Sequence, residues 1–441
     1  MSKTYRPYRI IEWQDKEATN AKGWLVMDCL INGICGGGLF MHPNVSLEEV
    51  ADLAHTMTLK NTLQSPQFGG GKGGIRFDPS DPRAKEVLRR FLESNEIYLK
   101  KFWCTGADLN TDNRTITEII QKDLGLPSPF YSLSKMLEER FGIENHILEM
   151  NERLETPLNK YFRIEESATG YSMSCCLQLS QIREPKVIIQ GFGAVGSSFA
   201  HFIQENKIGK VVGIADQSGF ISNRNGIDIH ALLEERKIQL NNGIIPIFKN
   251  YLTKDQKECY YFNSRSSSKS DEDYLVEFLS VVEGDIFSPC AGRYQITPKV
   301  LGTLCEKTLA QSIERTIISG ANNSFRDGTT FHLLKHLNIK MLPEWVSNCG
   351  NALLFLEALK TDYYGKEWVD SVLKIIHQRI TEALWNAMEH CHRDLGKIYE
   401  SFYFLAEQKV RFSKSQKPTL DSHENNYNEE ITPNYTESIA R

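Results

Sequence analysis

The feature that most constrains this chain is a glycine-rich turn between two short apolar runs. Residues 186–190 are typical of a strand, residues 191–196 read Gly-Phe-Gly-Ala-Val-Gly, a helical pattern follows, and residues 210–215 are typical of a second strand. This order predicts the β-α-β unit of a parallel sheet. In that context a GxGxxG turn indicates a dinucleotide site, whereas an isolated match could be an ordinary strand-to-helix turn.

Each position of this turn has a physical role. Gly191 permits the tight turn, Gly193 lets the backbone approach a pyrophosphate, and Gly196 allows the helix to pack closely on the strand. The N-terminus of the helix adds positive potential. Asp216, at the end of the next strand, is placed to accept hydrogen bonds from a ribose and to repel a 2′-phosphate, which predicts NAD as the cofactor. The cofactor-binding residues expected here are Gly191, Phe192, Gly193, Ala194, Val195, Gly196 and Asp216.

The composition narrows the classes of protein to consider. The chain has 441 residues, enough for two or three domains, and its 41% hydrophobic and 24% charged residues are ordinary for a globular protein. A net charge of −5 offers no basic face for phosphates, so we expect no nucleic acid partner. The N-terminus lacks the apolar segment of a signal peptide, and no stretch is apolar enough to span a membrane. We therefore expect a cytoplasmic protein with no membrane partner.

The ten cysteines are scattered, without a CxxC pair or a clustered histidine spacing. This distribution predicts reduced thiols and no metal site. Cys175 and Cys176 are adjacent, and we expect them to be two packing residues because cysteine behaves as a small buried hydrophobe.

The first half predicts two helices with a glycine-rich segment between them. Residues 46–63 and 82–102 carry apolar side chains at helical spacing. The segment between them, 68–74, surrounds Lys72 with glycines and is expected to be a loop, but not a Walker A loop, because glycine follows the lysine. The simplest alternative is a flexible surface loop with a solvated lysine.

Two lysines and one aspartate are the candidate catalytic groups of this half. Lys60 falls beside the apolar stripe of the first helix. Its ammonium therefore either extends past the edge of the core into solvent or needs a partner of opposite charge. With the glycine segment it suggests an anion pocket, in which Lys72 would have a lowered pKa suited to acid-base chemistry. Asp108 follows the second helix in a loop, and taken alone it is more often a helix cap or turn former.

Taken in order, these segments resemble the glutamate, leucine, phenylalanine and valine dehydrogenases over roughly residues 24–390. The Leu-Lys-Asn around Lys60, with Lys72 twelve residues later, matches the substrate segment of that family, and the Ala-Asp-Leu-Asn-Thr around Asp108 resembles its catalytic aspartate loop. Other matching segments are 78–79, 168–171, 190–196, 285–291, 320–323 and 348–350.

The resemblance implies an oxidoreductase that transfers a hydride from the Cα of an L-amino acid to NAD, with release of ammonia and a 2-oxo acid. It implies that Lys60 holds the substrate α-carboxylate, that Lys72 activates the attacking water, and that Asp108 moves protons to and from the amine. The residues that it places around the nicotinamide end of the cofactor are Thr169, Ala291 and Asn322, with Asn348 also beside the substrate.

The resemblance also implies an α/β fold of two domains. Residues 1–166, completed by 347–412, would form the substrate-binding and dimerisation domain, and residues 167–346 the Rossmann-type NAD-binding domain. Residues 413–441 contain too few apolar side chains to become ordered and are predicted to be a disordered tail. The polar stretch 263–271 is typical of a surface insertion. Because family members are commonly homo-oligomers, we expect one here.

Three positions depart from the family pattern. Phe40 stands where the family usually has an arginine. Gly36 and Phe355 stand where glutamate-specific relatives have a lysine and a serine that grip the side-chain carboxylate. Because a buried carboxylate without a partner costs several kcal/mol, these two residues predict an apolar amino acid substrate. Glutamate is the alternative, which would hold if another residue such as Arg163 reached the site.

Two functions of other classes also need to be considered. A non-catalytic regulatory protein could keep the fold and bind NAD or an amino acid, but the retention of Lys60, Lys72 and Asp108 argues against it. An unrelated Rossmann enzyme, such as a 2-hydroxy acid dehydrogenase, is disfavoured because no catalytic histidine with a nearby arginine suggests itself.

Overall fold

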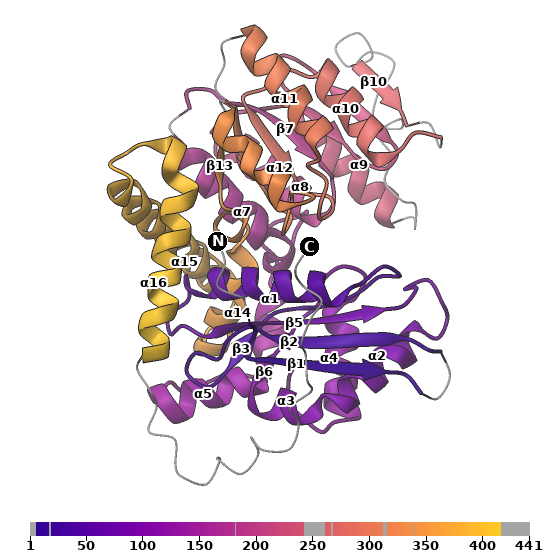
Figure 1. Ribbon diagram of the computed structural model, residues 1–441, viewed down its shortest axis with the longest axis vertical. Helices are drawn as coiled ribbons and strands as arrows, with labels where there is room; N and C mark the ends of the chain where they lie inside the picture. Colours follow the sequence, from indigo (N-terminus) through magenta and orange to yellow (C-terminus); the bar gives the residue numbers. More distant parts are fainter. Residues whose placement is uncertain are drawn as a thin grey trace.

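Two β-sheets, each covered by helices, organise the chain in the computed structural model (Figure 1). The structure describes residues 6–16, 19–180, 182–241, 261–265, 268–311, 315–337 and 339–415. Within these ranges, no helix combines the length and the apolar character needed to cross a membrane.

The first sheet is mixed and lies in the N-terminal half of the chain. Its strand order is β1-β2-β5-β3-β6, and β4 pairs with β5. β2 is antiparallel to both of its neighbours, β1 and β5, whereas β3 and β4 run parallel to β5. The strands are β1 (Arg9–Gln14), β2 (Lys22–Met27), β3 (Cys35–Gly36), β4 (Leu39–Met41), β5 (Gly69–Arg76) and β6 (Trp103–Cys104).

The glycine-rich segment is strand β5, so the prediction of a loop was wrong. Its backbone is crowded by neighbours that leave no space for side chains. A Cβ on Gly70 would lie 2.2 Å from the backbone nitrogen of Thr58 in the helix above, and one on Gly69 would lie 1.8 Å from the carbonyl oxygen of Cys29. A strand is recognised by the alternation of polar and apolar side chains along the sequence. Glycine has no side chain, so this pattern is missing from β5.

Helices cover both faces of this sheet. The first predicted helix is α1 (Leu47–Asn61), and Ser46 caps it by accepting a hydrogen bond from the backbone nitrogen of Glu49. The second predicted helix is divided at Asn95 into α2 (Ala84–Ser94) and α3 (Glu96–Lys101). The others are α4 (Asn113–Lys122), α5 (Tyr131–Phe141) and α6 (Met150–Leu154).

The second sheet confirms the predicted Rossmann-type α/β fold. Its order is β10-β9-β8-β7-β11-β12-β13, with β8, β7, β11, β12 and β13 parallel and with β9 and β10 antiparallel at one edge. The strands are β7 (Lys186–Gln190), β8 (Lys210–Ala215), β9 (Gly219–Ser222), β10 (Tyr261–Ser264), β11 (Ile286–Pro289), β12 (Arg315–Ile318) and β13 (Ile339–Leu342). The helices are α8 (Ala194–Glu205), α9 (Ile229–Asn241), α10 (Asp271–Val281), α11 (Pro298–Gln311) and α12 (Gly328–Leu333).

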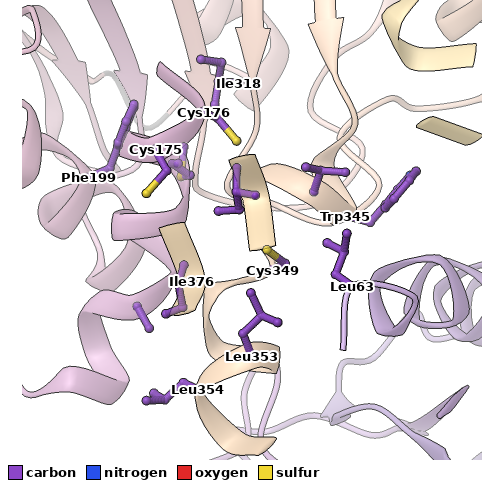
Figure 2. Close-up of a cluster of buried hydrophobic side chains, with 14 of the residues drawn as sticks. Leu63, Cys175, Cys176, Phe199, Ile318, Trp345, Cys349, Leu353, Leu354 and Ile376 are labelled. Atoms are coloured by element: carbon purple, nitrogen blue, oxygen red, sulfur yellow. The ribbon is translucent and has the colours of Figure 1, made fainter. Parts of the chain in front are cut away.

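A buried cluster of hydrophobic side chains joins the two halves (Figure 2). Cys175 and Cys176, both free thiols, pack here from α7 (Ile164–Leu179), as expected from the sequence. Cys349, Leu353 and Ile376 come from the C-terminal part of the chain. That part contains α13 (Glu344–Ser347), α14 (Gly350–Lys360), α15 (Gly365–His390) and α16 (Ile398–Ser415).

The last helices return along the N-terminal half (Figure 1). α14 contacts α6, and α16 contacts α1, while α15 packs on α7. Residues 413–415 end α16, and the rest of the predicted disordered tail, 416–441, lies outside the described residues. Of the predicted surface insertion, residues 266–267 also lie outside them.

Candidate active site

A cavity of about 590 Å³ lies where the two halves meet. The N-terminal half contributes residues of α1, β5 and the loop after β6, and the second half contributes the start of α8 and the loops after β11 and β12. The predicted site residues that line it are Gly36, Lys60, Lys72, Asp108, Thr169, Ala194, Val195, Ala291, Asn322, Asn348 and Phe355. The fold thus brings together most of the residues singled out from the sequence.

Lys72 and Asp108 form an ion pair at this cavity. The Nζ of Lys72 donates a hydrogen bond to Oδ2 of Asp108, and only 1% of Lys72 is exposed. Lys72 is fixed by its position in the sheet, where it pairs with Val26 of β2. Because an ammonium and a carboxylate share this buried position, the pair can hold or pass a proton at a defined place.

The loop that carries Asp108 is tied to β4. The backbone nitrogen of Asp108 donates to the carbonyl oxygen of Leu39 at 3.1 Å, and the backbone nitrogen of Leu109 donates to Oδ1 of Asp108 at 2.7 Å. Burial raises the pKa of Asp108, but Lys72, Arg293 and the Leu109 hydrogen bond together hold it below its ordinary value. Asp108 is therefore a carboxylate at neutral pH.

Lys60 is almost fully buried and reaches across to the second half. Its Nζ donates to Oδ1 of Asn322 at 3.0 Å, and Nδ2 of Asn348 donates to the same oxygen at 2.9 Å. Burial, and then the positive charge of Lys72, lower the pKa of Lys60 to about 8. The sequence did not single out Lys60 for a lowered pKa, because its burial and its closeness to Lys72 arise only in the folded chain.

The dinucleotide turn has the geometry that its glycines predict. Gly191 has φ +97°, a left-handed conformation that favours glycine, and a Cβ there would lie 2.8 Å from the backbone nitrogen of Ala291. A Cβ on Gly196 would lie 1.9 Å from the carbonyl oxygen of Gly191, so α8 packs directly on the turn. A Cβ on Gly193 would meet nothing within 4 Å, which leaves open space at the N-terminus of α8. The turn can therefore receive a pyrophosphate.

Asp216 lies at the end of β8, as predicted. Its Oδ1 accepts hydrogen bonds from the backbone nitrogen and the hydroxyl of Ser218, both at 2.7 Å. Burial raises the pKa of Asp216, and the hydrogen bonds of Ser218 and Gly219 partly oppose this effect. One oxygen of the Asp216 carboxylate, Oδ1, therefore stabilises the turn between β8 and β9.

The wall around Gly36 and Phe355 is apolar. A Cβ on Gly36 would touch Cys104 and Phe68, and the ring of Phe355 lies 5.1 Å from that of Phe130. Arg163, the other candidate for a carboxylate partner, does not line the cavity. It is bound instead to Glu155 and Glu166.

Arg293 is a cavity residue that the sequence argument missed. It follows β11 by four residues, and its guanidinium stands 4.2 Å from the centre of the Phe40 ring. An arginine in a loop carries no periodic signal, so only its closeness to the Ser-Pro-Cys-Ala segment ending at Ala291 could have drawn attention to it.

A second group of side chains that the sequence argument did not find lies away from the cavity. His201, Glu205 and His230 each bring one potential ligand atom to within 4.8 Å of the others. However, Nδ2 of Asn159 donates to Nε2 of His201 at 2.9 Å, and Oδ1 of the same amide is held by two backbone N–H groups. Nε2 of His201 is thus already an acceptor in a packed network, whereas its buried Nδ1 has no hydrogen-bond partner among the described residues.

Two family models match this chain. Residues 162–416 match the family model Glutamate/Leucine/Phenylalanine/Valine dehydrogenase, and residues 7–123 match Glu/Leu/Phe/Val dehydrogenase, dimerisation domain. An NAD-specific glutamate dehydrogenase of Staphylococcus aureus is 33% identical over 77% of this chain and 73% of the relative. An NADP-specific glutamate dehydrogenase of Saccharolobus shibatae is 26% identical over 87% of this chain and 81% of the relative.

The fold is likewise similar to solved structures. The crystal structure of Plasmodium falciparum glutamate dehydrogenase superimposes with a TM-score of 0.66 at 20% identity, and covers 92% of this chain and 84% of that one. The larger family model alone covers more than half of the 441 residues. The chain therefore belongs to the glutamate, leucine, phenylalanine and valine dehydrogenase family.

Proposed function

We propose that this protein catalyses the NAD-dependent oxidative deamination of L-glutamate to a 2-oxo acid and ammonia. The observation that carries this proposal is the convergence of Lys60, Lys72 and Asp108 on one cavity beside the dinucleotide turn. Oxidative deamination needs a carboxylate binder, an acid-base group and a dinucleotide site in one place.

The residues of the second half fit a nicotinamide dinucleotide. Gly193 leaves space for the pyrophosphate at the N-terminus of α8, where free backbone N–H groups and the helix dipole favour an anion. Thr169 and Asn322 line the cavity on the side of α7 and β12, and they would hold the nicotinamide end. When bound, the dinucleotide accepts a hydride from the substrate Cα.

The residues of the first half bind the substrate and move its protons. Lys60 binds the α-carboxylate, and Oδ1 of Asn348, a buried oxygen without a hydrogen-bond partner, accepts a hydrogen bond from the α-amino group. Loss of a proton from nitrogen and of a hydride from Cα leaves an imine. Lys72 orients the water that adds to the imine carbon, and Asp108 takes a proton from that water and returns it to the nitrogen. The hydroxyl proton of the resulting carbinolamine then passes to the nitrogen as the C–N bond breaks, so the carbonyl of the 2-oxo acid forms and ammonia leaves.

Glutamate is the first candidate because the relatives that match most of the chain are named glutamate dehydrogenases. Gly36 and Phe355 predict an apolar amino acid, and the comparisons do not support that prediction. Asn351 lines the cavity one helical turn before Phe355 on α14 and supplies a neutral amide donor for a second carboxylate. An apolar amino acid remains the second candidate, favoured by the wall of Phe68, Phe130 and Phe355.

NAD is the proposed cofactor because Asp216 places a carboxylate at the end of β8, where it repels a 2′-phosphate. The relatives include both an NAD-specific and an NADP-specific enzyme, so this choice rests on Asp216.

We also propose that the protein forms a homo-oligomer, because residues 7–123 match a dimerisation domain. The proposed domains are residues 1–166 with 347–412, and residues 167–346. The two sheets support this division, since they fall within residues 9–104 and 186–342. The proposed boundary at 166 lies in the first turn of α7.

The test is a spectrophotometric assay of NAD and NADP reduction by the purified protein with glutamate, leucine, valine, phenylalanine and tryptophan. We expect the highest kcat/KM for glutamate with NAD. A higher value for any of the apolar amino acids would replace glutamate with the second candidate. Binding of NADH without reduction of either cofactor by any amino acid would support a regulatory protein instead.

A further inference from the structure

Among the described residues, helix α1 makes polar contacts with the second half of the molecule from one stripe of the helix. Glu49 meets Arg293, the hydroxyl of Thr56 donates to Oδ1 of Asn323 at 2.8 Å, and Lys60 meets Asn322. The partners lie in the loops after β11 and β12. The cavity is therefore closed on this side by contacts that would break if the two halves moved apart.

Arg293 contacts both a charged and an aromatic side chain of the N-terminal half. Its Nη2 lies 3.1 Å from Oε1 of Glu49, and its guanidinium lies on the face of the fully buried Phe40 ring. The side chains of Arg293 and Glu49 are only 11% and 18% exposed, so this ion pair is screened less than a surface pair. Arginine suits this position because its planar guanidinium can stack on a ring and bind a carboxylate at once.

The backbone on both sides of the contact is held in place. Tyr294 has φ +59°, a left-handed conformation that is uncommon for a bulky residue, and its backbone nitrogen donates to the carbonyl oxygen of Asn323 at 2.9 Å. On the other side, Glu49 lies in the capped first turn of α1. The strained residue next to Arg293 indicates that its orientation is fixed by the surrounding structure.

We propose that Arg293 is a positioning residue that closes the cleft and completes the electrostatic surroundings of the catalytic carboxylate. Its guanidinium, carried by the dinucleotide-binding half, docks between Phe40 and Glu49 of the other half and brings a second cation to Asp108 beside Lys72. The part of this inference that concerns Asp108 rests on the proposed function. Closure of the cleft and preparation of the acid-base group are then one event.

The charges around Asp108 come from three separate elements. Lys72 belongs to β5, Lys60 to α1, and Arg293 to the loop after β11. Lys72 and Arg293 both lower the pKa of Asp108, against the effect of burial. Of these three cations only Arg293 belongs to the dinucleotide-binding half, so a separation of the two halves would remove its charge and raise the pKa of Asp108.

Arg293 is a poor candidate for a direct ligand of a substrate carboxylate. Its guanidinium already has a carboxylate partner in Glu49, and one face is covered by Phe40. A second carboxylate would have to share the guanidinium with Glu49. We therefore expect the substitution of Arg293 to change catalysis and closure more than the KM for the amino acid.

The variants that test this are Arg293→Met, Arg293→Lys and Glu49→Gln, with Arg224→Met as the control. Arg224 is exposed and lies near the start of β8, at the opposite end of the strand from the cofactor turn. The first readout is the pH dependence of kcat at saturating substrates. In Arg293→Met we expect the acidic limb to move up by about 0.5–1 pH unit, because Asp108 has lost one cation. Arg293→Lys should return the acidic limb most of the way to its wild-type position, because lysine keeps the positive charge. Glu49→Gln should move the acidic limb by a smaller amount.

The second readout is small-angle scattering with and without NADH, which requires no turnover. We expect NADH to reduce the radius of gyration of the wild-type and Arg224→Met proteins more than that of Arg293→Met. Equal compaction together with an unchanged acidic limb would overturn the proposal. A change confined to the KM for the amino acid would instead make Arg293 a substrate ligand. If the wild-type protein turned over no amino acid, the proposed function would fail, and scattering would still decide whether Arg293 closes the cleft.

Discussion

The Nζ of Lys72 donates a hydrogen bond to Oδ2 of Asp108, although the two residues are 36 positions apart and come from different elements. One is fixed in the middle of a sheet, and the other is held at the start of a loop by its hydrogen bonds to β4. The proposed reaction depends on this proton-transfer pair, which faces the dinucleotide-binding half.

Removing either partner of this pair should stop turnover without abolishing cofactor binding. We expect Lys72→Ala and Asp108→Asn to lower kcat by at least about 100-fold, the usual scale of general acid-base catalysis. NADH fluorescence titration should give a Kd close to that of the wild-type protein. Lys135→Ala, at an exposed lysine of α5, is the matched control. Near-normal kcat in both site variants would exclude this pair from the chemistry.

The binding of the substrate carboxylate should weaken at alkaline pH. Burial lowers the pKa of Lys60 to about 8, so its positive charge is present below that pH and is lost as the pH rises through it. We expect the inhibition constant of the 2-oxo acid product, which has no titrating amine, to rise roughly tenfold per pH unit above this pKa. In Lys60→Gln the constant should be higher at neutral pH and independent of pH in this range. A flat profile in the wild-type protein would contradict the assignment.

Cofactor choice should depend on the charge of Asp216. Asp216→Ser removes the repulsion between the carboxylate and a 2′-phosphate, so the ratio of kcat/KM for NAD to that for NADP should fall. The parent protein should prefer NAD. Equal kcat/KM values for the two cofactors in the parent protein would show that Asp216 serves only the turn that it forms with Ser218.

Two glycines of the cofactor turn should respond differently to the same substitution. A Cβ at Gly196 would lie 1.9 Å from the carbonyl oxygen of Gly191, so Gly196→Ala should lower the free energy of unfolding by about 1–3 kcal/mol. A Cβ at Gly193 meets nothing within 4 Å, so Gly193→Ala should keep the wild-type Tm and bind NADH more weakly. Thermal unfolding and NADH titration of both variants provide the comparison. Wild-type affinity for NADH in Gly193→Ala would place the pyrophosphate elsewhere.

The residues that could be predicted from the sequence are those whose role follows from local order along the chain. The dinucleotide turn follows a strand and begins a helix, so Gly191 and Gly196 could be placed by their neighbours alone. Lys60, Lys72 and Asp108 were found because they occur in order within a family pattern. The structure then shows that they face one cavity.

Other features depend on contacts that no local pattern contains. β5 was predicted to be a loop because its glycines hide the alternation of a strand, and the need for them arises from the backbones of α1 and the segment after β2. The lowered pKa of Lys60 follows from its burial and from the charge of Lys72, and both arise only in the folded chain. Arg293 was missed because its partners, Phe40 and Glu49, lie about 250 residues earlier in the chain.

The most direct test of the account is a single assay that measures NADH and ammonia together. Purified wild-type protein with glutamate and NAD should form one ammonia for each NADH, and both products should disappear together in Asp108→Asn. Formation of NADH without ammonia, or equal rates in the wild-type protein and the Asp108→Asn variant, would contradict the proposal that this cavity is the site of oxidative deamination.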